Sequence, residues 1–443
     1  MANTKISELA EASMLDGTES FPVVQGGVTK KTTPASLITD RGVVTATRDA
    51  SGNVVGLSAV GSTIALPLRG TTMLVDGDSY ADVLGTQDFS DDTSRGAVGI
   101  SGWLQWLMLG RLRPVANLGV GGQTTTQIIA RLQASVDVCA KLVLLVSPGI
   151  NDVKGAIPVA TTIANLTAIF DAHIANGSTI VTITCPPSNL IDTTAEKQAL
   201  FTLNRWLLDE STRRPGLIVV DVNPAVSAPA TVAWRTGYST DATHPNVVGS
   251  HAIADLIAAA LDKVIPSTGS VITTNNADPY ELVTNPRMVG DTAGVADSTT
   301  STGGTGAASK VARTDIEGDW QRWDGTAAGL HYFFKSVTTG YSAGQRLVGR
   351  VELRAPDAAD WGPPTQSAVY IEQRNSSNAV VGTSISVELT VSSDAAFHDR
   401  IIVELNPVTV HADAVGGSIR LGYKFNGVGK IDIGAMSLLV VGT

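Results

Sequence analysis

The sequence predicts an α/β domain followed by an all-β domain, with a small β-rich segment ahead of both. Near-continuous apolar runs alternate with longer helical patterns from Thr71 to about Lys263, as in a parallel sheet covered on both faces. Dense strand patterns separated by turn residues take over after Pro266. The 443 residues are enough for two or three folded units.

Residues 1–67 form the first predicted part. Short apolar pieces (FPVVQ, GVVTATR, TIALPL) are broken there by glycines and prolines, which predicts small β-elements and turns. We see no self-contained core in this segment.

Residues 68–267 form the predicted α/β part. Buried parallel strands are predicted at 72–75, 142–146, 179–184 and 217–222, because each is a short, almost wholly apolar run. A helix over 160–175 ends at an Asn-Gly pair typical of a C-cap. Thr193 and Glu196 have the spacing of a capping box before the next helix, and a last helix is predicted near 248–264.

Residues 268–443 form the predicted all-β part. Its strand patterns predict an antiparallel sandwich or jelly roll; they are HYFFKSV, RLVGRVELR, AVYIEQR, AVVGTSISVELT, RIIVELN, SIRLGYKF and DIGAMSLLVV.

Composition excludes several classes of protein. Thirty-one basic and 41 acidic side chains give a net charge of −10 without a basic run, so we expect no nucleic-acid partner. No apolar stretch reaches the ~18 residues of a membrane helix, and the first residues lack the apolar core of an export signal. Cys139 and Cys185 lie in apolar runs and are expected to be buried, reduced thiols. We expect neither a metal site nor a cofactor.

The first strand of the α/β part runs into Asp76-Gly77-Asp78-Ser79-Tyr80. A serine at the carboxyl end of a parallel strand lies where such sheets place their ligand sites. The plainer alternative is a strand-to-helix turn in which the serine caps the next helix.

Three further segments are expected at the same edge of the sheet. Residues 117–124 supply glycine N–H groups before a helix, residues 147–152 place Asn151 after a strand, and residues 239–246 bring Asp241 and His244 close together in sequence. The four segments together point to one site.

These motifs, GDSY, GGQT, GIND and DATHP, resemble those of the SGNH (GDSL) hydrolase family in order and spacing over about residues 70–265. The resemblance implies a flavodoxin-like, three-layer α/β/α fold and a serine esterase. It makes Ser79 the nucleophile, and His244 and Asp241 its triad partners. It makes Ser79, Gly122 and Asn151 the donors of the oxyanion hole, although Gly119 and Gly121 compete with Gly122.

The chemistry of these residue types agrees with those roles. A serine hydroxyl needs a base such as His244, and a carboxylate such as Asp241 holds the imidazole in the required tautomer. His173 and His251 lie in predicted helices and are expected to be structural, while Asp78 and Asp152 are expected to cap or brace turns.

The two ends suggest a setting. Residues 4–40 resemble the N-terminal segments with which tail-fibre and tailspike proteins of bacteriophages attach to the virion. The C-terminal part is similar to carbohydrate-binding-like sandwich modules. Its aromatics could stack on sugars, although a core position is the more common fate of each. These aromatics are Trp320, Trp323, Tyr332, Tyr341 and Trp361.

Together these resemblances imply a phage tail receptor-binding protein with esterase activity. It would remove O-acetyl groups from a bacterial capsule or O-antigen through an acyl-enzyme on Ser79. It would be made in the host cytoplasm, lie in the virion tail as a homotrimer, and contact other tail proteins through its N-terminal segment. The alternatives are a non-catalytic polysaccharide-binding adhesin on the same scaffold, and a secreted-type lipase or acetylxylan esterase.

Overall fold

The computed structural model describes residues 71–82, 99–146, 149–239, 241–265, 281–356, 366–388 and 400–442, together with short strands before residue 60. The chain divides into two compact units, Met1–Leu66 with Gly442–Thr443, and Pro67–Val441. The boundaries that we predicted at 67/68 and 267/268 lie outside the described residues.

The first unit contains short antiparallel strands. β1 (Phe21–Gln25) pairs with β2 (Val28–Thr32), while β3 (Ile38–Thr39), β4 (Gly42–Arg48) and β5 (Val54–Ala59) form a three-stranded sheet. Strands were predicted at FPVVQ and GVVTATR, and the third piece, TIALPL, lies outside the described residues.

The α/β part is built on five parallel strands. Their order is β10 (Leu217–Val220), β9 (Thr179–Ile183), β8 (Leu142–Val146), β6 (Thr71–Gly77) and β7 (Leu112–Asn117). Numbered along the chain this is 2-1-3-4-5, the flavodoxin-like order. The four predicted strands are confirmed. β7 was not predicted, because it is a partly exposed edge strand that contains Pro114.

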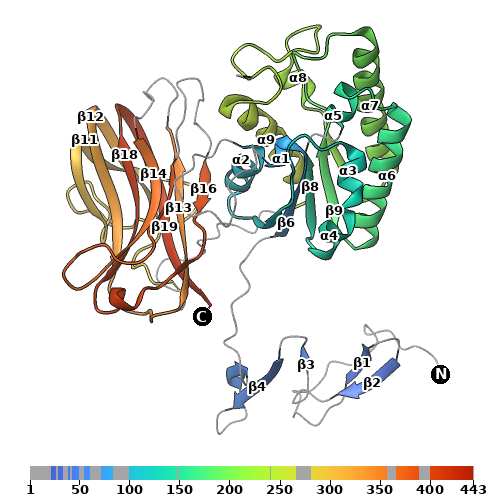
Figure 1. Cartoon of the computed structure of the whole chain (residues 1–443). Coiled ribbons are helices and arrows are strands. Elements are labelled where there is room, and N and C mark those ends of the chain that lie inside the picture. Colours follow the sequence, from blue (N-terminus) through green and yellow to red (C-terminus); the bar gives the residue numbers. More distant parts are fainter. Residues whose placement is uncertain are drawn as a thin grey trace. The chain divides into compact units, whose positions relative to one another are not determined.

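Helices cover both faces of this sheet (Figure 1). α2 (Ile100–Leu107) and α9 (Val247–Leu261) pack together on one face, and α3 (Thr125–Ala130), α6 (Val159–Ala175) and α7 (Thr194–Arg213) lie on the other. The predicted capping box of Thr193 and Glu196 is present at the start of α7. The remaining short helices are α1 (Ser79–Asp82), α4 (Leu132–Asp137), α5 (Ile150–Lys154) and α8 (Asn223–Val226).

The sheet centre depends on a close approach of two strands. β6 pairs with β8 so that Gly77 lies opposite Val146. Gly77 has a φ of +141°, and a Cβ there would lie 2.4 Å from the Val146 carbonyl oxygen. Only glycine fits this position, which fixes the end of β6 just before Ser79.

The prediction that both cysteines are buried was wrong for one of them. Cys185 is buried, but Cys139 is exposed and has a φ of +53°. The apolar run VDVCAKLVLLV is divided: its first residues end α4 and turn, and only LVLLV enters the sheet.

The C-terminal part is antiparallel, as predicted. Its main sheet has the order β15-β14-β18-β12-β19-β13-β16, with β11 paired to β12 and β17 paired to β13. The strand bounds are β11 Thr300–Ala312, β12 Asp319–Val337, β13 Arg346–Arg354, β14 Gln366–Arg374, β15 Ile385–Glu388, β16 Ile401–Glu404, β17 Val408–Thr409, β18 Ser418–Asn426 and β19 Gly429–Gly442. A 3-10 helix, η3, spans Ala412–Ala414. β12 pairs with β19 through Gln321–Gly325 and with β18 through Leu330–Val337, so one long strand joins two groups of strands.

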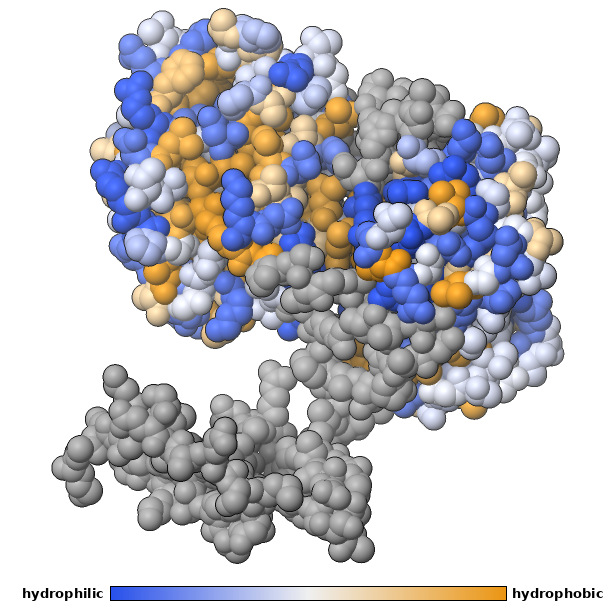
Figure 2. Space-filling view, turned by 180° about the vertical axis from the view of Figure 1, so that it is seen from behind, coloured by the Kyte–Doolittle hydropathy of each residue, from blue (hydrophilic) through white to orange (hydrophobic). Residues whose placement is uncertain are grey.

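Exposed apolar side chains occur in both of these parts. Figure 2 shows hydrophobic residues gathered over the α/β part on one face of the molecule. Phe201 is 55 % exposed and is the one aromatic among the large hydrophobic side chains that stand exposed in the described ranges; the others are Val115, Val120, Leu190, Val264, Val380, Val415 and Val428. No helix in the described part of the chain has the length and apolarity to span a membrane.

Lys335 is a buried cation in β12. It is 2 % exposed, and its Nζ lies 3.3 Å from the Asp297 carbonyl oxygen and 3.5 Å from that of Ser298. Burial first, and the nearby Lys310 second, lower the pKa of Lys335 to about 7. An unfolded lysine has a pKa of about 10.4. Between about pH 7 and pH 10 this lysine is therefore protonated in the unfolded chain and largely neutral in the folded one. Stability should therefore rise from pH 7 toward pH 10, while below pH 7 the cost of burying the charge is fully present.

We expect Lys335→Met to raise the free energy of unfolding at pH 7 by roughly 1–3 kcal/mol, because a buried charge is replaced by an apolar chain. Calorimetric melting should give Lys335→Met a higher Tm than the wild type at pH 7. The rise in Tm from pH 7 to pH 9 should be smaller for Lys335→Met than for the wild type. Lys424→Met, at a partly exposed lysine on β18, is the control and should leave the pH dependence as it is. A lower Tm for Lys335→Met at both pH values would contradict this account.

Candidate active site

Ser79 lies at the carboxyl end of β6, where it begins α1 and is partly exposed. The preceding Asp78 is 1 % exposed, and its Oδ1 accepts the N–H of Tyr80 at 3.0 Å. Asp78 thus braces the turn that presents Ser79, in the role predicted for it.

The structure brings the three predicted triad residues together. The Oγ of Ser79 lies 2.7 Å from Nε2 of His244, and Nδ1 of His244 lies 2.5 Å from Oδ2 of Asp241. The side chains of His244 and Asp241 are 27 % and 53 % exposed, so a solvent-borne substrate can approach them.

The turn from Asp241 to His244 is held in a strained form. The Oδ1 of Asp241 accepts the N–H groups of Thr243 at 2.9 Å and His244 at 2.6 Å. Ala242 has a φ of +67°, which a side chain disfavours. Its carbonyl accepts the N–H of Asn189 at 2.8 Å and the hydroxyl of Ser188 at 3.3 Å, so the loop after β9 supports the turn.

Tyr80 and Trp234 support the turn from inside. The Thr243 carbonyl accepts the Tyr80 hydroxyl and the Trp234 Nε1–H, the latter at 3.0 Å. Burial first, and Asp78 second, raise the pKa of Tyr80 well above its usual value, so its hydroxyl stays a donor. The Tyr80 ring centre also lies 5.3 Å from that of His244, which packs the imidazole from the side.

Asp241 is the charged residue in the hydrogen-bonded chain Ser79–His244–Asp241. Partial burial acts to raise the pKa of its carboxyl, but the hydrogen bonds from His244 and Thr243 lower it more, and the net shift is downward. Asp241 is therefore ionised at neutral pH and accepts a hydrogen bond from the His244 Nδ1–H.

The loop after β7 holds the candidate oxyanion glycines. The N–H of Gly119 donates to Oδ1 of Asn117 at 3.0 Å, so it is occupied. Gly122 is exposed with a φ of +76°, and within the described ranges its N–H and that of Ser79 donate no hydrogen bond. The geometry favours Gly122 over Gly119.

Asn151 follows β8 and lies in α5, close to the turn that carries Ser79 and to the glycine loop after β7. Its Nδ2 donates to Oδ2 of Asp78 at 3.1 Å and to the Gln123 carbonyl at 3.0 Å. Both amide hydrogens are thus engaged, and the amide ties the Ser79 turn to the glycine loop. To serve as an oxyanion donor as well, Asn151 must share or exchange one of these bonds, so that role stays a prediction.

Arg131 was missed by sequence reasoning. It follows α3, and it donates to Asp76 Oδ1 at 2.6 Å, to the Gly77 carbonyl at 2.9 Å and to Gln123 Oε1 at 2.7 Å. One guanidinium therefore links the end of β6 to the glycine loop. A lone arginine in a helical pattern gives no sequence signal of such a role.

The other predicted structural residues lie apart from the triad. His173 is buried, its Nε2 lies 3.1 Å from the Ser135 hydroxyl, and burial lowers its pKa. The ring of His251 packs edge-on against Trp103 with the centres 4.8 Å apart. Asp152 accepts hydrogen bonds from the N–H and hydroxyl of Thr125 and from the hydroxyl of Thr162, and so braces α3 against α6.

Two of the five aromatic residues proposed for sugar stacking lie in the β core. Trp320 is 2 % exposed, with the guanidinium groups of Arg313 and Arg354 4.3 Å and 4.1 Å from its ring centre. Trp323 is 5 % exposed and stacks on His331. Neither ring face is open to a sugar. Tyr332 and Tyr341 are partly buried, and Trp361 lies outside the described residues.

The arrangement has a defined chemical capacity. A serine hydroxyl bonded to an imidazole, which is itself held by a carboxylate, is an activated nucleophile with a built-in proton acceptor. Nearby N–H groups can stabilise negative charge that develops on a substrate oxygen. Within the described ranges no three His, Cys, Asp or Glu side chains are grouped so that they could hold a metal ion.

Comparisons with known proteins bear on the α/β part. Residues 76–252 match the model of the GDSL-like Lipase/Acylhydrolase family, a range that contains Ser79, Asn151, Asp241 and His244. No curated protein matches the chain.

Solved structures similar to the chain include three of different origin. A GDSL-like lipase from Bacteroides thetaiotaomicron is 17 % identical, covering 44 % of this chain and 88 % of its own, with a TM-score of 0.35. An acetylxylan esterase from Geobacillus stearothermophilus is 20 % identical, covering 45 % and 95 %, with a TM-score of 0.36. The enzymatically active domain of tailspike protein 4 of bacteriophage CBA120 is 13 % identical, covering 40 % and 24 %, with a TM-score of 0.29.

Proposed function

We propose that the α/β part is a serine-dependent carboxylic ester hydrolase that removes O-acetyl groups from a bacterial surface polysaccharide, either capsule or O-antigen. The observation that carries the ester chemistry is the unbroken relay from the Ser79 hydroxyl through His244 to Asp241, with contacts of 2.7 Å and 2.5 Å. The match of residues 76–252 to a family of lipases and acylhydrolases supports the same chemistry.

In the acylation step, the Ser79 oxygen attacks the acetyl carbonyl carbon while His244 Nε2 takes the serine proton. The tetrahedral intermediate then collapses. The bond to the sugar oxygen breaks, and that oxygen leaves with the proton from His244. Acetyl remains on Ser79, and the sugar hydroxyl is free.

In the deacylation step, His244 takes a proton from water, and the water oxygen attacks the acetyl-serine carbonyl. Collapse of this second intermediate returns the proton to Ser79 and releases acetate. In both steps the N–H groups of Ser79 and Gly122, with the Asn151 amide if it exchanges a bond, would face the negative oxygen.

The proposed substrate and setting rest on the two ends of the chain. The resemblance of residues 4–40 to phage attachment segments supports a tail protein in the virion, a homotrimer held to other tail proteins through this segment. A tail protein meets the polysaccharide of the host surface first. The O-acetyl groups of such a polysaccharide are esters. They are small enough to enter an active site at the edge of a sheet.

The rival function is a non-catalytic adhesin. Binding alone requires neither an aligned base on the serine nor an ionised carboxylate on that base, and the site has both. Acetate release from O-acetylated capsule and O-antigen preparations, followed by proton NMR, tests the proposal. Binding of such a polysaccharide without any acetate release would favour the adhesin.

Arg131→Met should lower kcat for 4-nitrophenyl acetate by about 10-fold to 100-fold while KM changes less, because the glycine loop loses its tie to β6 and the oxyanion donors shift. Arg131→Lys keeps a charge opposite Asp76 and should recover part of the loss.

The matched control for Arg131 is Arg111. Its guanidinium is also multiply bonded, to the carbonyl and Sδ of Met108, to the Ile265 carbonyl and to Asp262, but at the other end of β7. Arg111→Met should reduce Tm and leave kcat within about twofold. Equal kcat losses in the two variants would show that Arg131 acts only through stability.

A further inference from the structure

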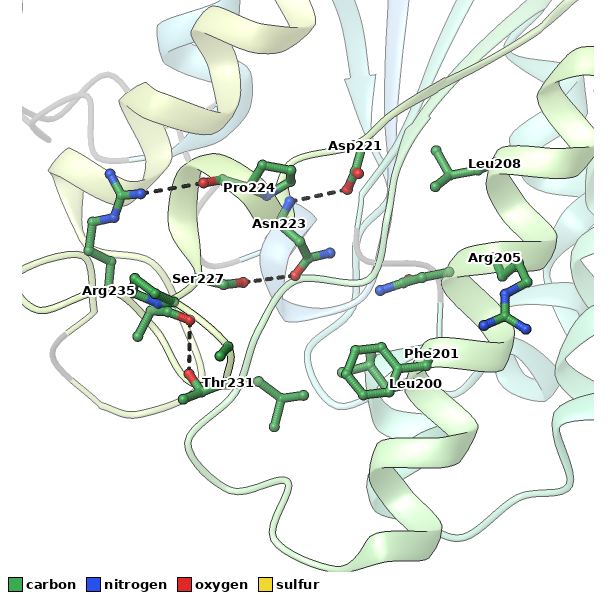
Figure 3. A pocket seen from close by; sticks show the side chains of 15 residues that line it. Leu200, Phe201, Arg205, Leu208, Asp221, Asn223, Pro224, Ser227, Thr231 and Arg235 are labelled. Atoms are coloured by element: carbon green, nitrogen blue, oxygen red, sulfur yellow. Dashed lines mark hydrogen bonds between the residues drawn. The ribbon is translucent and has the colours of Figure 1, made fainter.

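A groove in the α/β part lies beside the turn that carries Asp241 and His244. Its larger hollow, about 610 Å³ in volume, lies between α7 and the segment from Asp221 to Arg235 (Figure 3). A smaller hollow of about 340 Å³ lies beside the loop after β9. The two hollows share four lining residues and so form one groove; these are Phe201, Ala230, Thr231 and Val232.

This groove adjoins the catalytic turn without being part of it. Ser188 and Asn189 line the smaller hollow and also hydrogen-bond to the carbonyl of Ala242, between Asp241 and Thr243. The larger hollow lies past the end of β10, three strands from β6 in the sheet. Three inter-strand spacings are roughly 14 Å, which is too far for an acetyl group on Ser79 to span but within reach of a chain of sugars.

The walls combine an aromatic face with polar groups. Phe201 is 55 % exposed, and Arg205, one helical turn further along α7, also lines the larger hollow (Figure 3). Arg205 has no ion-pair partner among the described residues. An aromatic ring beside hydrogen-bond donors suits a sugar, which has an apolar face of C–H groups and a rim of hydroxyls.

The floor of the groove is rigid. Asn204 of α7 accepts the Cys185 N–H at 2.7 Å and donates to the Cys185 carbonyl at 3.1 Å. Asn223 of α8 donates to the Thr184 hydroxyl at 2.9 Å and to the Cys185 carbonyl at 3.0 Å. These bonds fix α7 and α8 to the end of β9, so the groove is preformed and a ligand need not order it.

We infer that this groove binds sugar residues of the same polysaccharide chain, next to the acetylated residue at Ser79, with one ring stacked on Phe201 and polar groups bonded to Arg205. The inference rests on the proposed function and adds to it that the enzyme binds several neighbouring sugar residues of its substrate. Loss of the groove should therefore penalise a polymeric substrate more than a small ester.

The test compares Phe201→Ala with the wild type on two substrates: the O-acetylated polysaccharide from which the wild type releases acetate, and 4-nitrophenyl acetate. We expect the ratio of the two kcat/KM values, polysaccharide over small ester, to fall about tenfold. Phe201→Tyr keeps the ring and should retain the ratio, while Phe201→Leu keeps only apolar volume and should not. Val264→Ala removes an equally exposed apolar side chain elsewhere and should leave the ratio unchanged.

A binding measurement separates this inference from the esterase itself. In a Ser79→Ala background, calorimetric titration with the same polysaccharide after alkaline de-acetylation should show binding that Phe201→Ala weakens about tenfold. If acetate is released but neither the ratio nor the binding depends on Phe201, the groove inference is wrong and the esterase stands. If a panel of capsules and O-antigens yields no acetate but shows binding that depends on Phe201, the groove stands and the esterase proposal fails.

Discussion

Ser79→Ala is expected to lower kcat/KM for 4-nitrophenyl acetate by about 10⁴-fold to 10⁶-fold, because the nucleophile is removed and only binding and the oxyanion donors remain. The side chain is partly exposed and its hydroxyl bonds to His244 alone among the contacts of the described residues, so the fold should persist. Initial rates with enzyme in excess would measure so large a loss.

The control for Ser79 is Ser211→Ala. Ser211 lies on α7 and its hydroxyl donates to the Leu208 carbonyl at 2.8 Å, away from the triad. This variant should keep the wild-type rate within about twofold. A Ser79→Ala protein that retained more than a tenth of the wild-type rate would show that another group carries the ester chemistry.

Asp241→Asn is expected to lower kcat by about 10⁴-fold while the turn keeps its shape. An asparagine oxygen can still accept the N–H groups of Thr243 and His244 that Oδ1 accepts now. The amide nitrogen would face Nδ1 of His244, which must then accept a hydrogen bond and carry its proton on Nε2 instead. In that tautomer Nε2 cannot take the Ser79 proton.

Asp262→Asn is a matched control for Asp241→Asn. Asp262 is 56 % exposed against 53 % for Asp241, and its carboxylate likewise bonds to a nitrogen-bearing side chain, that of Arg111. Its replacement should leave kcat within about twofold. Comparable losses in both variants would mean that surface charge, rather than the tautomer of His244, sets the rate.

The lowered pKa of Asp241 sets the sign of its pH effect. Burial acts to raise that pKa, but the hydrogen bonds from His244 and Thr243 outweigh it. A carboxyl with a lower pKa in the folded than in the unfolded chain adds stability above its unfolded value of about 3.9. That contribution is lost only as the pH falls through the folded value. We therefore expect the difference in Tm between the wild type and Asp241→Asn to shrink as the pH falls below about pH 4.

The positions of the active-site residues at the ends of strands were predictable, because strong local sequence patterns mark those strands. Ser79 and Asn151 each follow an apolar run that becomes a buried parallel strand, and such strands all deliver their carboxyl ends to one edge. Asp241 and His244 are three residues apart, so a single turn brings them together. Their roles in catalysis stay a prediction that the variants above test.

The rest depends on contacts between distant segments, which one sequence does not display. Arg131 reaches Asp76, Gly77 and Gln123 only after the sheet has formed. The bonds that occupy the Asn151 amide arise in the same way. β7 was not predicted because, as an edge strand, it is partly polar and contains a proline, so its sequence lacks the apolar run of a buried strand.

The most direct test of the proposed function is acetate release from an O-acetylated capsule or O-antigen of the bacterial host. Proton NMR of the polysaccharide with the wild type and with Ser79→Ala would follow both free acetate and the acetyl groups left on the chain. We predict that the wild type releases acetate in step with the loss of bound acetyl, and that Ser79→Ala releases none over the same period. Unchanged acetyl signals with the wild type, on a polysaccharide that it demonstrably binds, would contradict the esterase and leave a binding protein.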